Sequence, residues 1–278
     1  MFRYVYYYLE KQNRIQIVGL SALAEWDGIT FIEFLPEKMG EIEFPDEAIF
    51  LSDNIKQAEE KKREGIPVTF FELGETCYDS EIGIRYIFKT VEAVTREYLT
   101  EVYCREHRIP MEILETRRCK VREIDERDLE RLYEIYAVPQ ITQYMEPLFA
   151  NRQDELDYIR TYIDTIYPLY GFGMWVIVEK ASNRVIGRAG FEVKDDYPDG
   201  IELGFIIAEE YQRQGFAYEV CSTILQFARE KLDYEFAYSE VIPENSASIR
   251  LCEKLGFTFR GKKLLEGKIY FEYGKCLK

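Results

Sequence analysis

The chain has very few residues of the kinds that build cysteine or histidine sites. Histidine occurs once in 278 residues, as His107, and the six cysteines are widely scattered. A disulfide framework or a zinc site needs such residues at close, paired spacings, so we expect neither, and no metal. Unpaired cysteines fit a reducing compartment, which favours the cytoplasm. His107 lies near an expected helix end, beside Arg105 and Arg108, and is predicted to be a surface residue rather than a base.

Long apolar runs are also missing. The aromatic start of the chain meets Glu10, Lys11 and Arg14 before an apolar core of signal-peptide length can form. No other stretch is long and apolar enough to span a bilayer, so we expect no membrane segment. The net charge is −15, which opposes binding to phosphate backbones and argues against a nucleic-acid partner.

Positive charge is concentrated in one place, the stretch from Arg250 to Lys278. This stretch holds eight Lys and Arg residues against three Glu residues. A solvated tail is the favoured interpretation of such a cluster, and a phosphate-binding patch is the alternative.

The chain has enough apolar residues to build one large hydrophobic core or two of ordinary size, since 47% of its residues are hydrophobic. Glu47–Asp53 is predicted as a buried strand, followed by a helix from Asn54 to Gly65 and a second strand over Ile66–Phe71. Such a unit has a parallel strand pair, so residues 1–115 are expected to form a small α/β domain. Asp53 is expected to cap the helix rather than to serve a ligand site at the strand end.

The first domain is completed by a strand over Ile84–Phe88 and a helix from about Glu92 to Arg105. Pro110 breaks that helix pattern, and a new strand begins at Cys119. These two signals place the domain boundary near residue 115.

The stretch from Ser52 to Pro67 faintly resembles a late strand–helix element of haloacid-dehalogenase-type phosphatases. The Asp-x-Asp-x-Thr nucleophile loop that this family needs is absent from the sequence. A Rossmann-type nucleotide site is disfavoured as well, because there is no Gly-x-Gly-x-x-Gly turn. We therefore predict no catalysis in the first domain.

One short segment carries a chemical signature, and it consists of Gln212, Arg213, Gln214, Gly215, Phe216 and Ala217. It joins an expected strand, Ile201–Ala208, to an amphipathic helix. A turn of this kind leaves backbone N–H groups free at the helix start, where the helix dipole adds positive potential. Gly215 permits a positive φ or a close backbone approach, and the small Ala217 leaves room for a pyrophosphate. The segment is predicted to bind an anion.

The residues downstream extend this signature. A strand over Phe236–Ile242 is followed by Asn245-Ser246-Ala247-Ser248, a helix, and Glu253-Lys254-Leu255-Gly256-Phe257. This order resembles the GNAT superfamily of N-acetyltransferases, in particular the ribosomal-protein alanine acetyltransferase branch, over residues 117–278. The resemblance implies that residues 116–278 form a GNAT acyltransferase fold with a mixed central sheet, so the whole chain would be of the α/β (α+β) class.

Earlier parts of the second domain agree with the family's β-α-α-β-β-β-α-β-α-β order. The expected elements are a strand over Lys120–Ile124, helices over Arg127–Tyr136 and Asp154–Ile166, and strands over Trp175–Glu179 and Val185–Val193. By the resemblance, the strands that end near Ala208 and Ile242 splay apart and hold the cofactor between them.

The resemblance also implies acetyl-CoA as cosubstrate and assigns residues to it. Strand backbone would pair with the pantetheine arm at Phe205, Ile206 and Ile207, and N–H groups would hold the pyrophosphate at Arg213, Gly215 and Ala217. Asn245 would bond the pantetheine, cap the next helix, or do both. Ser248 would either satisfy the N–H groups of the helix start or reach the cofactor.

Catalysis needs a base, because an alkylamine is protonated at neutral pH, with a pKa of ~10.4 for lysine and ~8 for an α-amine. Glu202 resembles the strand glutamate that takes this role, often through water, in this branch. Glu192 on the neighbouring strand is the alternative, and either residue can instead be an edge carboxylate that faces solvent. The oxyanion would be stabilised by the N–H of Phe205 or Ile206.

The acid step has no assigned residue. Many GNAT enzymes place a tyrosine seven residues after the asparagine, where this chain has Cys252. A thiol with a pKa of ~8.5 could donate a proton, or Cys252 packs as a small apolar residue. Acceptor recognition is expected in the segment Ala137–Gly173, with a loop around Tyr144–Pro147. Tyr and Trp side chains near the mouth of the site are predicted to pack in the core rather than line a pocket.

The expected function is therefore transfer of acetyl from acetyl-CoA to a primary amine, on a protein N-terminus or a small molecule. The alternative is a non-catalytic acyl-CoA-binding sensor, which the missing tyrosine and the additional domain suggest. The sequence leaves open the acceptor, the oligomeric state and the role of the first domain.

Overall fold

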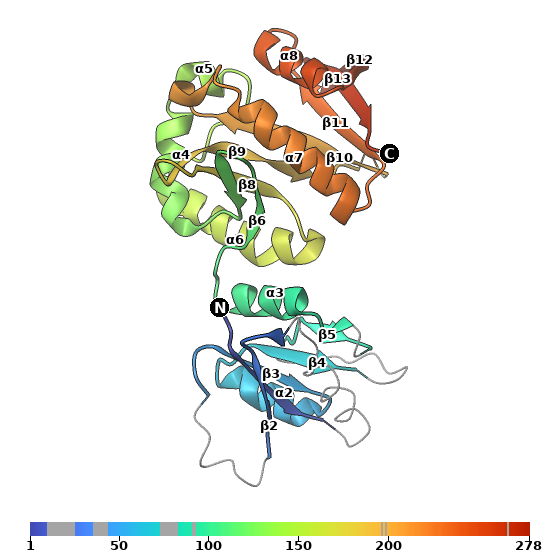
Figure 1. Cartoon of the computed structure of the whole chain (residues 1–278). Coiled ribbons are helices and arrows are strands. Elements are labelled where there is room, and N and C mark those ends of the chain that lie inside the picture. The colour runs from blue at the N-terminus through green and yellow to red at the C-terminus, as the bar shows by residue number, and fades with distance from the viewer. Residues whose placement is uncertain are drawn as a thin grey trace. The chain divides into compact units, whose positions relative to one another are not determined.

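The computed structural model describes residues 1–9, 26–35, 44–72, 83–90, 93–195, 197, 199–265 and 267–278. Glu10, Lys11, Arg14, Cys77 and the expected helix start at Glu92 lie outside these residues. The chain divides into two compact units, Met1–Ile109 and Pro110–Lys278, each built around its own sheet (Figure 1).

The first unit contains a five-stranded parallel sheet in the order β2-β1-β3-β4-β5. Its strands are β1 (Tyr4–Tyr8), β2 (Thr30–Glu33), β3 (Ala48–Ser52), β4 (Val68–Phe71) and β5 (Ile87–Phe88), and its helices are α2 (Ile55–Arg63) and α3 (Arg96–Glu106). Every residue of β3 and β4 is buried, which explains their continuous apolar runs.

The predicted parallel strand–helix–strand unit is confirmed as β3, α2 and β4. The predicted cap is wrong by one residue: the Oδ1 atom of Asn54, not the side chain of Asp53, accepts the N–H of Gln57 at 3.2 Å. A strand is expected over Ile84–Phe88, and only its last two residues, Ile87 and Phe88, form strand β5. His107 is the exposed C-cap of α3, as expected of a surface residue.

The second unit contains an eight-stranded mixed sheet in the order β12-β13-β11-β10-β9-β8-β7-β6. Its strands are β6 (Glu112–Glu115), β7 (Cys119–Arg122), β8 (Met174–Glu179), β9 (Arg184–Glu192), β10 (Gly200–Ile207), β11 (Phe236–Val241), β12 (Thr258–Leu265) and β13 (Lys268–Cys276). All neighbours in this sheet pair antiparallel except β10 and β11, which pair parallel. The mixed sheet expected from the resemblance is confirmed.

The helices of this unit are α4 (Leu129–Tyr136), α5 (Pro139–Thr142), α6 (Arg152–Tyr170), α7 (Phe216–Lys231) and α8 (Ser246–Lys254), with short 3-10 turns η4 (Glu126–Asp128) and η5 (Glu209–Tyr211). Helix α7 lies against the sheet over β9 and β10 (Figure 1). Its apolar stripe is buried as predicted, through Val220, Cys221, Ile224, Leu225 and Ala228. None of the helices among the described residues combines the length and the hydropathy needed to cross a membrane.

The sequence did not predict β1 and β2 in the first unit, nor β6, α5 and a second carboxy-terminal strand in the second unit. The structure also corrects the interpretation of the basic stretch from Arg250 as a solvated tail. That stretch forms most of α8 and the hairpin β12–β13, whose second strand pairs with β11. The positive charges are therefore fixed on folded elements.

Candidate active site

Strands β10 and β11 pair over only three residues and then diverge. The parallel ladder runs from Gly200 with Phe236 to Glu202 with Tyr238. Beyond it, β10 continues to Ile207 against β9, while β11 continues to Val241 against β13. The facing edges of both strands are thus left without a strand partner, and their backbone groups can bind a ligand as an added strand would.

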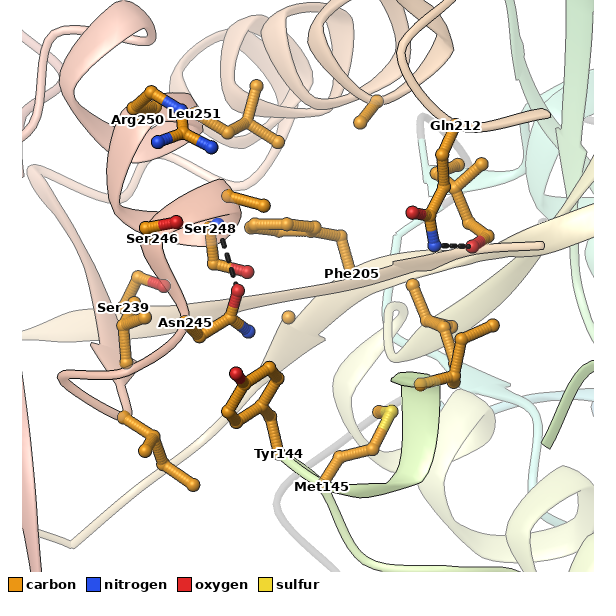
Figure 2. A pocket seen from close by; sticks show the side chains of 18 of the residues that line it. Tyr144, Met145, Phe205, Gln212, Ser239, Asn245, Ser246, Ser248, Arg250 and Leu251 are labelled. Atoms are coloured by element: carbon orange, nitrogen blue, oxygen red, sulfur yellow. Dashed lines mark hydrogen bonds between the residues drawn. The ribbon is translucent and has the colours of Figure 1, made fainter. Parts of the chain in front are cut away.

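A cavity of about 790 Å³ opens where the strands diverge. In Figure 2, Phe205 and Gln212 lie across from Ser248 and Arg250, and Tyr144 and Met145 reach it from the segment after α5. Most of the predicted site residues line it: Glu202, Phe205, Ile206, Ile207, Gln212, Arg213, Gly215, Phe216, Ala217, Asn245 and Ser248. Glu192, Gln214 and Cys252 are not among its lining residues.

The turn before α7 contains two residues with a positive φ. Gly215 has a φ of 84° and Arg213 a φ of 58°, so both are left-handed. Helix α7 then begins at Phe216, and no side chain in the described part of the chain caps it. The N–H groups of its first turn therefore lack an intrahelical partner and face a site that suits an anion.

Two glutamines hold this turn in shape. The Nε2 atom of Gln212 donates to the carbonyl oxygen of Ile207 at 3.0 Å, which ties the turn to the end of β10. The Nε2 atom of Gln214 donates to the carbonyl oxygen of Glu210 at 2.7 Å. Gln214, predicted as a cofactor-binding residue, therefore uses its side chain to brace the turn and does not line the cavity.

Asn245 caps a helix and also lines the cavity. Its Oδ1 atom accepts the N–H of Ser248 at 3.1 Å and so caps α8, as the dashed line in Figure 2 shows. Asn245 and Ser248 also line the cavity. The cap fixes where the remaining polar atoms of both residues lie, on the side of the cavity opposite β10.

Glu202 stands at the point where the two strands separate. Its side chain is 16% exposed and its Oε1 atom accepts the N–H of Glu240 at 3.3 Å, so the carboxylate fills the first gap in the ladder. Its Oε2 atom lies 3.3 Å from the Nζ atom of Lys194. Burial raises the pKa of Glu202, and the ammonium of Lys194 partly opposes this rise. A carboxylate with a raised pKa is a better proton acceptor.

Glu192, the alternative base, pairs with Glu202 in the β9–β10 register and also contacts Lys194 at 3.3 Å. Its side chain is 52% exposed, and it does not line the cavity. The structure therefore separates the two candidates, with Glu202 in the cavity and Glu192 at the surface.

Cys252, the candidate acid, is fully buried in the core. Burial raises the pKa of its thiol, while a hydrogen bond with Ser239 opposes the rise. Because Cys252 does not line the cavity, its position agrees with packing rather than with proton donation.

Several cavity residues were missed by the sequence, among them Gln140, Gln143, Tyr218, Ser239, Glu240, Arg250 and Lys254. Arg250 and Lys254 are spaced four residues apart and so share one face of α8, which is a signal within the basic stretch that could have found them. The Nζ atom of Lys254 lies 4.2 Å from the ring centre of Tyr218. Tyr144, predicted to lie in a loop, also lines the cavity. No cluster of three or more possible metal ligands occurs among the described residues.

Comparisons with known proteins bear on this site. The family model for the acetyltransferase (GNAT) domain matches residues 118–258, just over half of the chain. An uncharacterized N-acetyltransferase of Bacillus subtilis (strain 168), YoaA, is 28% identical over 152 residues, which are 54% of this chain and 84% of that protein.

Two solved structures share the fold. The GNAT-family acetyltransferase from Bacillus anthracis has a TM-score of 0.52 at 19% identity and covers 60% of this chain and 99% of its own. RimL, a ribosomal L7/L12 alpha-N-protein acetyltransferase solved in complex with coenzyme A, has a TM-score of 0.51 at 16% identity, covering 60% of this chain and 98% of its own. With its sheet, its turn and the match of the family model, this chain belongs to the GNAT acetyltransferase family.

Proposed function

We propose that the chain transfers acetyl from acetyl-CoA to a primary amine, on a protein N-terminus or a small molecule. The observation that carries this proposal is the position of Glu202, a mostly buried carboxylate in the same cavity as an uncapped helix start. One end of the cavity thus offers a proton acceptor and the other offers N–H donors to an anion.

The residues of the cavity fit acetyl-CoA. The N–H groups of Arg213, Gly215 and Ala217 would hold its diphosphate at the start of α7. The open edge of β10 at Phe205–Ile207 would pair with the amides of its pantetheine arm, in the way that an extended peptide adds to a sheet. Asn245 would contact the arm from the side of α8.

The proposed reaction follows from these positions. Glu202 removes a proton from the ammonium of the acceptor, directly or through a water, and the free amine attacks the thioester carbonyl. The developing oxyanion accepts a hydrogen bond from the N–H of Phe205 or Ile206, whose direction the strand already fixes. The C=O bond re-forms as the C–S bond breaks, coenzyme A leaves as a thiolate, and the nitrogen releases its second proton to solvent, which leaves a neutral amide. The cytoplasm is the proposed compartment, because the described cysteines are free thiols.

The test is thiol release by the purified protein from acetyl-CoA with a panel of amines, comparing the parent with Glu202→Gln. We expect turnover by the parent and a loss of kcat of about 100-fold or more in the variant, because the amide cannot accept the proton. Calorimetry should give both proteins the same affinity for coenzyme A, since the substitution is distant from the turn.

Glu192→Gln is the matched control, because Glu192 contacts the same lysine but lies outside the cavity. Its kcat should stay close to that of the parent. Binding of coenzyme A without turnover on any amine would instead favour a non-catalytic acyl-CoA sensor. A Glu202→Gln variant with the kcat of the parent would remove Glu202 from the mechanism.

A further inference from the structure

The turn before α7 is fastened by a side chain that is distant in the sequence. Arg118 lies between β6 and β7, and its Nη1 atom donates to the carbonyl oxygen of Gln214 at 3.0 Å. Its guanidinium also covers the ring of Phe216, with 3.9 Å between the guanidinium carbon and the ring centre. Arg118 therefore contacts the residues on both sides of Gly215.

A carboxylate in the first turn of α7 anchors this arginine. Glu219 accepts from the Nε atom of Arg118 at 2.7 Å, and its second oxygen accepts from the N–H of Arg118 at 2.8 Å and the hydroxyl of Thr116 at 2.7 Å. The hydroxyl of Thr116 in turn accepts the N–H of Cys119 at 2.9 Å, and Glu219 is the nearer of its two acceptors, at 2.7 Å against 3.4 Å for the carbonyl oxygen of Cys119. Three donors thus hold one carboxylate.

These contacts matter for an anion site because the carboxylate of Glu219 is itself negatively charged. An unpaired carboxylate within one turn of the helix start would repel a diphosphate bound there. Burial acts to raise the pKa of Glu219, but the bonds from Thr116 and Arg118 outweigh it and lower the pKa. Glu219 is consequently charged at neutral pH, and Arg118 offsets that charge.

The remaining nitrogen of Arg118 is on the side of Gly215. Its Nη2 atom lies 3.6 Å from the position that a Cβ atom would take on Gly215. Gly215 lines the cavity and Arg118 does not, so Arg118 acts on the cavity through the turn. The Nε and Nη1 atoms are already engaged with Glu219 and Gln214. A guanidinium presents several fixed donors at once, so Arg118 can hold the carboxylate of Glu219 and the carbonyl oxygen of Gln214 in one geometry.

We propose that Arg118 is a positioning residue of the acetyl-CoA site, which holds the Gln212–Ala217 turn in the conformation that binds the diphosphate. The proposal rests on the proposed function, since the diphosphate is that of acetyl-CoA. Arg118 lies outside the Gln-x-x-Gly-x-Ala motif in the sequence, and the fold brings it next to the turn.

The first test is calorimetry with coenzyme A on the full chain. Arg118→Gln should bind about 10- to 30-fold more weakly than the parent, because the turn loses its bond through Gln214 and the charge of Glu219 is left without its partner. Arg118→Lys should fall between the two, because it keeps the charge but loses the planar fork. Arg118→Lys also serves if Arg118→Gln does not fold.

The second test separates diphosphate binding from general damage by changing the acetyl donor. S-acetylpantetheine carries the thioester and the pantetheine arm but no diphosphate. The KM of Arg118→Gln should rise for acetyl-CoA, with kcat close to that of the parent, and stay unchanged for S-acetylpantetheine.

Arg127→Gln is the matched control, because Arg127 makes a two-point pair with Asp125 through bonds of 2.9 and 2.6 Å on the surface. Its affinity for coenzyme A should equal that of the parent. Equal affinity of Arg118→Gln and the parent would overturn the proposal, as would equal losses with both acetyl donors. If the parent itself gives no heat with coenzyme A, the proposed function fails and this proposal with it.

Discussion

The two ends of the cavity differ in charge and in the elements that build them. Carboxylates gather where the strands diverge, with Glu202 on β10 and Glu240 on β11. Cations gather at the other end, with Arg213 in the turn and Arg250 and Lys254 on α8. Ile207 lies five residue steps along β10 from Glu202, which is about 16 Å at ~3.3 Å per step.

This distance allows one extended ligand to place its phosphates at the cationic end and its reacting group at the acidic end. Because the two ends differ in charge, substitutions at each end should affect different properties of the protein. Substitutions at the cationic end should weaken binding of acetyl-CoA and leave kcat unchanged. Substitutions at the acidic end should change turnover or its pH dependence and leave binding unchanged.

At the cationic end, the largest loss of affinity for coenzyme A is expected from Gly215→Glu. The substitution places a side chain at a φ of 84°, which non-glycine residues rarely adopt, and adds a negative charge at the anion site. We expect coenzyme A to bind about 100-fold more weakly, measured by calorimetry.

Gly65→Glu provides the control for backbone strain, because Gly65 has a φ of 82° in the first unit and open space around it. It should lower the thermal midpoint but keep the affinity for coenzyme A. Unchanged affinity in Gly215→Glu would mean that the turn does not hold the diphosphate.

A smaller effect is expected when Arg250 and Lys254 are both changed to Gln. Removing two cations from the lining should raise the KM for acetyl-CoA about tenfold at low ionic strength and leave kcat unchanged. The difference should shrink as salt is added, because screening weakens what the parent gains from these charges.

Lys262→Gln with Lys268→Gln is the matched control, since it removes the same charge from the hairpin β12–β13, outside the cavity lining. Steady-state kinetics at several salt concentrations would compare the two double variants. Equal changes in KM would show that only net charge matters and that Arg250 and Lys254 have no local role.

The smallest effect concerns the acidic end and the pH dependence of turnover. Burial raises the pKa of Glu202, and Lys194 partly opposes this, so Lys194→Met should raise the pKa further. Glu202 accepts a proton only when it is deprotonated, so the acid limb of the kcat profile should move to higher pH. Above that limb, the parent and the variant should have the same kcat.

Lys120→Met serves as control, because Lys120 pairs with Glu112 and Glu115 in the β6–β7 hairpin, outside the cavity lining. Its pH profile should match that of the parent. An acid limb that stays in place or moves to lower pH in Lys194→Met would exclude Glu202 as the group that controls it.

Local signals in the sequence predicted much of the second unit. The periodic apolar residues of α7 identified its buried face, and the glycine-containing turn identified the uncapped helix start. Such features depend on residues a few positions apart, so a single stretch of sequence contains them. The off-by-one cap in the first unit has the same origin, because Asp53 and Asn54 are both good capping residues and only the backbone geometry chooses between them.

Features that depend on distant pairing could not be predicted in this way. Arg118 meets Glu219 only because the β6–β7 turn and α7 are brought together by the sheet, 101 residues apart in the chain. The hairpin β12–β13 is largely exposed along its first strand, so it lacks the apolar alternation that marks a half-buried strand. Because this strand is exposed and rich in lysine, its sequence favours the interpretation of a solvated tail.

The most direct measurement is a crystal structure of the protein with coenzyme A. The account predicts diphosphate oxygens at hydrogen-bond distance, about 2.7–3.2 Å, from the N–H groups of Arg213, Gly215 and Ala217. It also predicts the sulfur beside Glu202, where β10 and β11 separate. A diphosphate bound away from this turn, or a sulfur distant from Glu202, would contradict it.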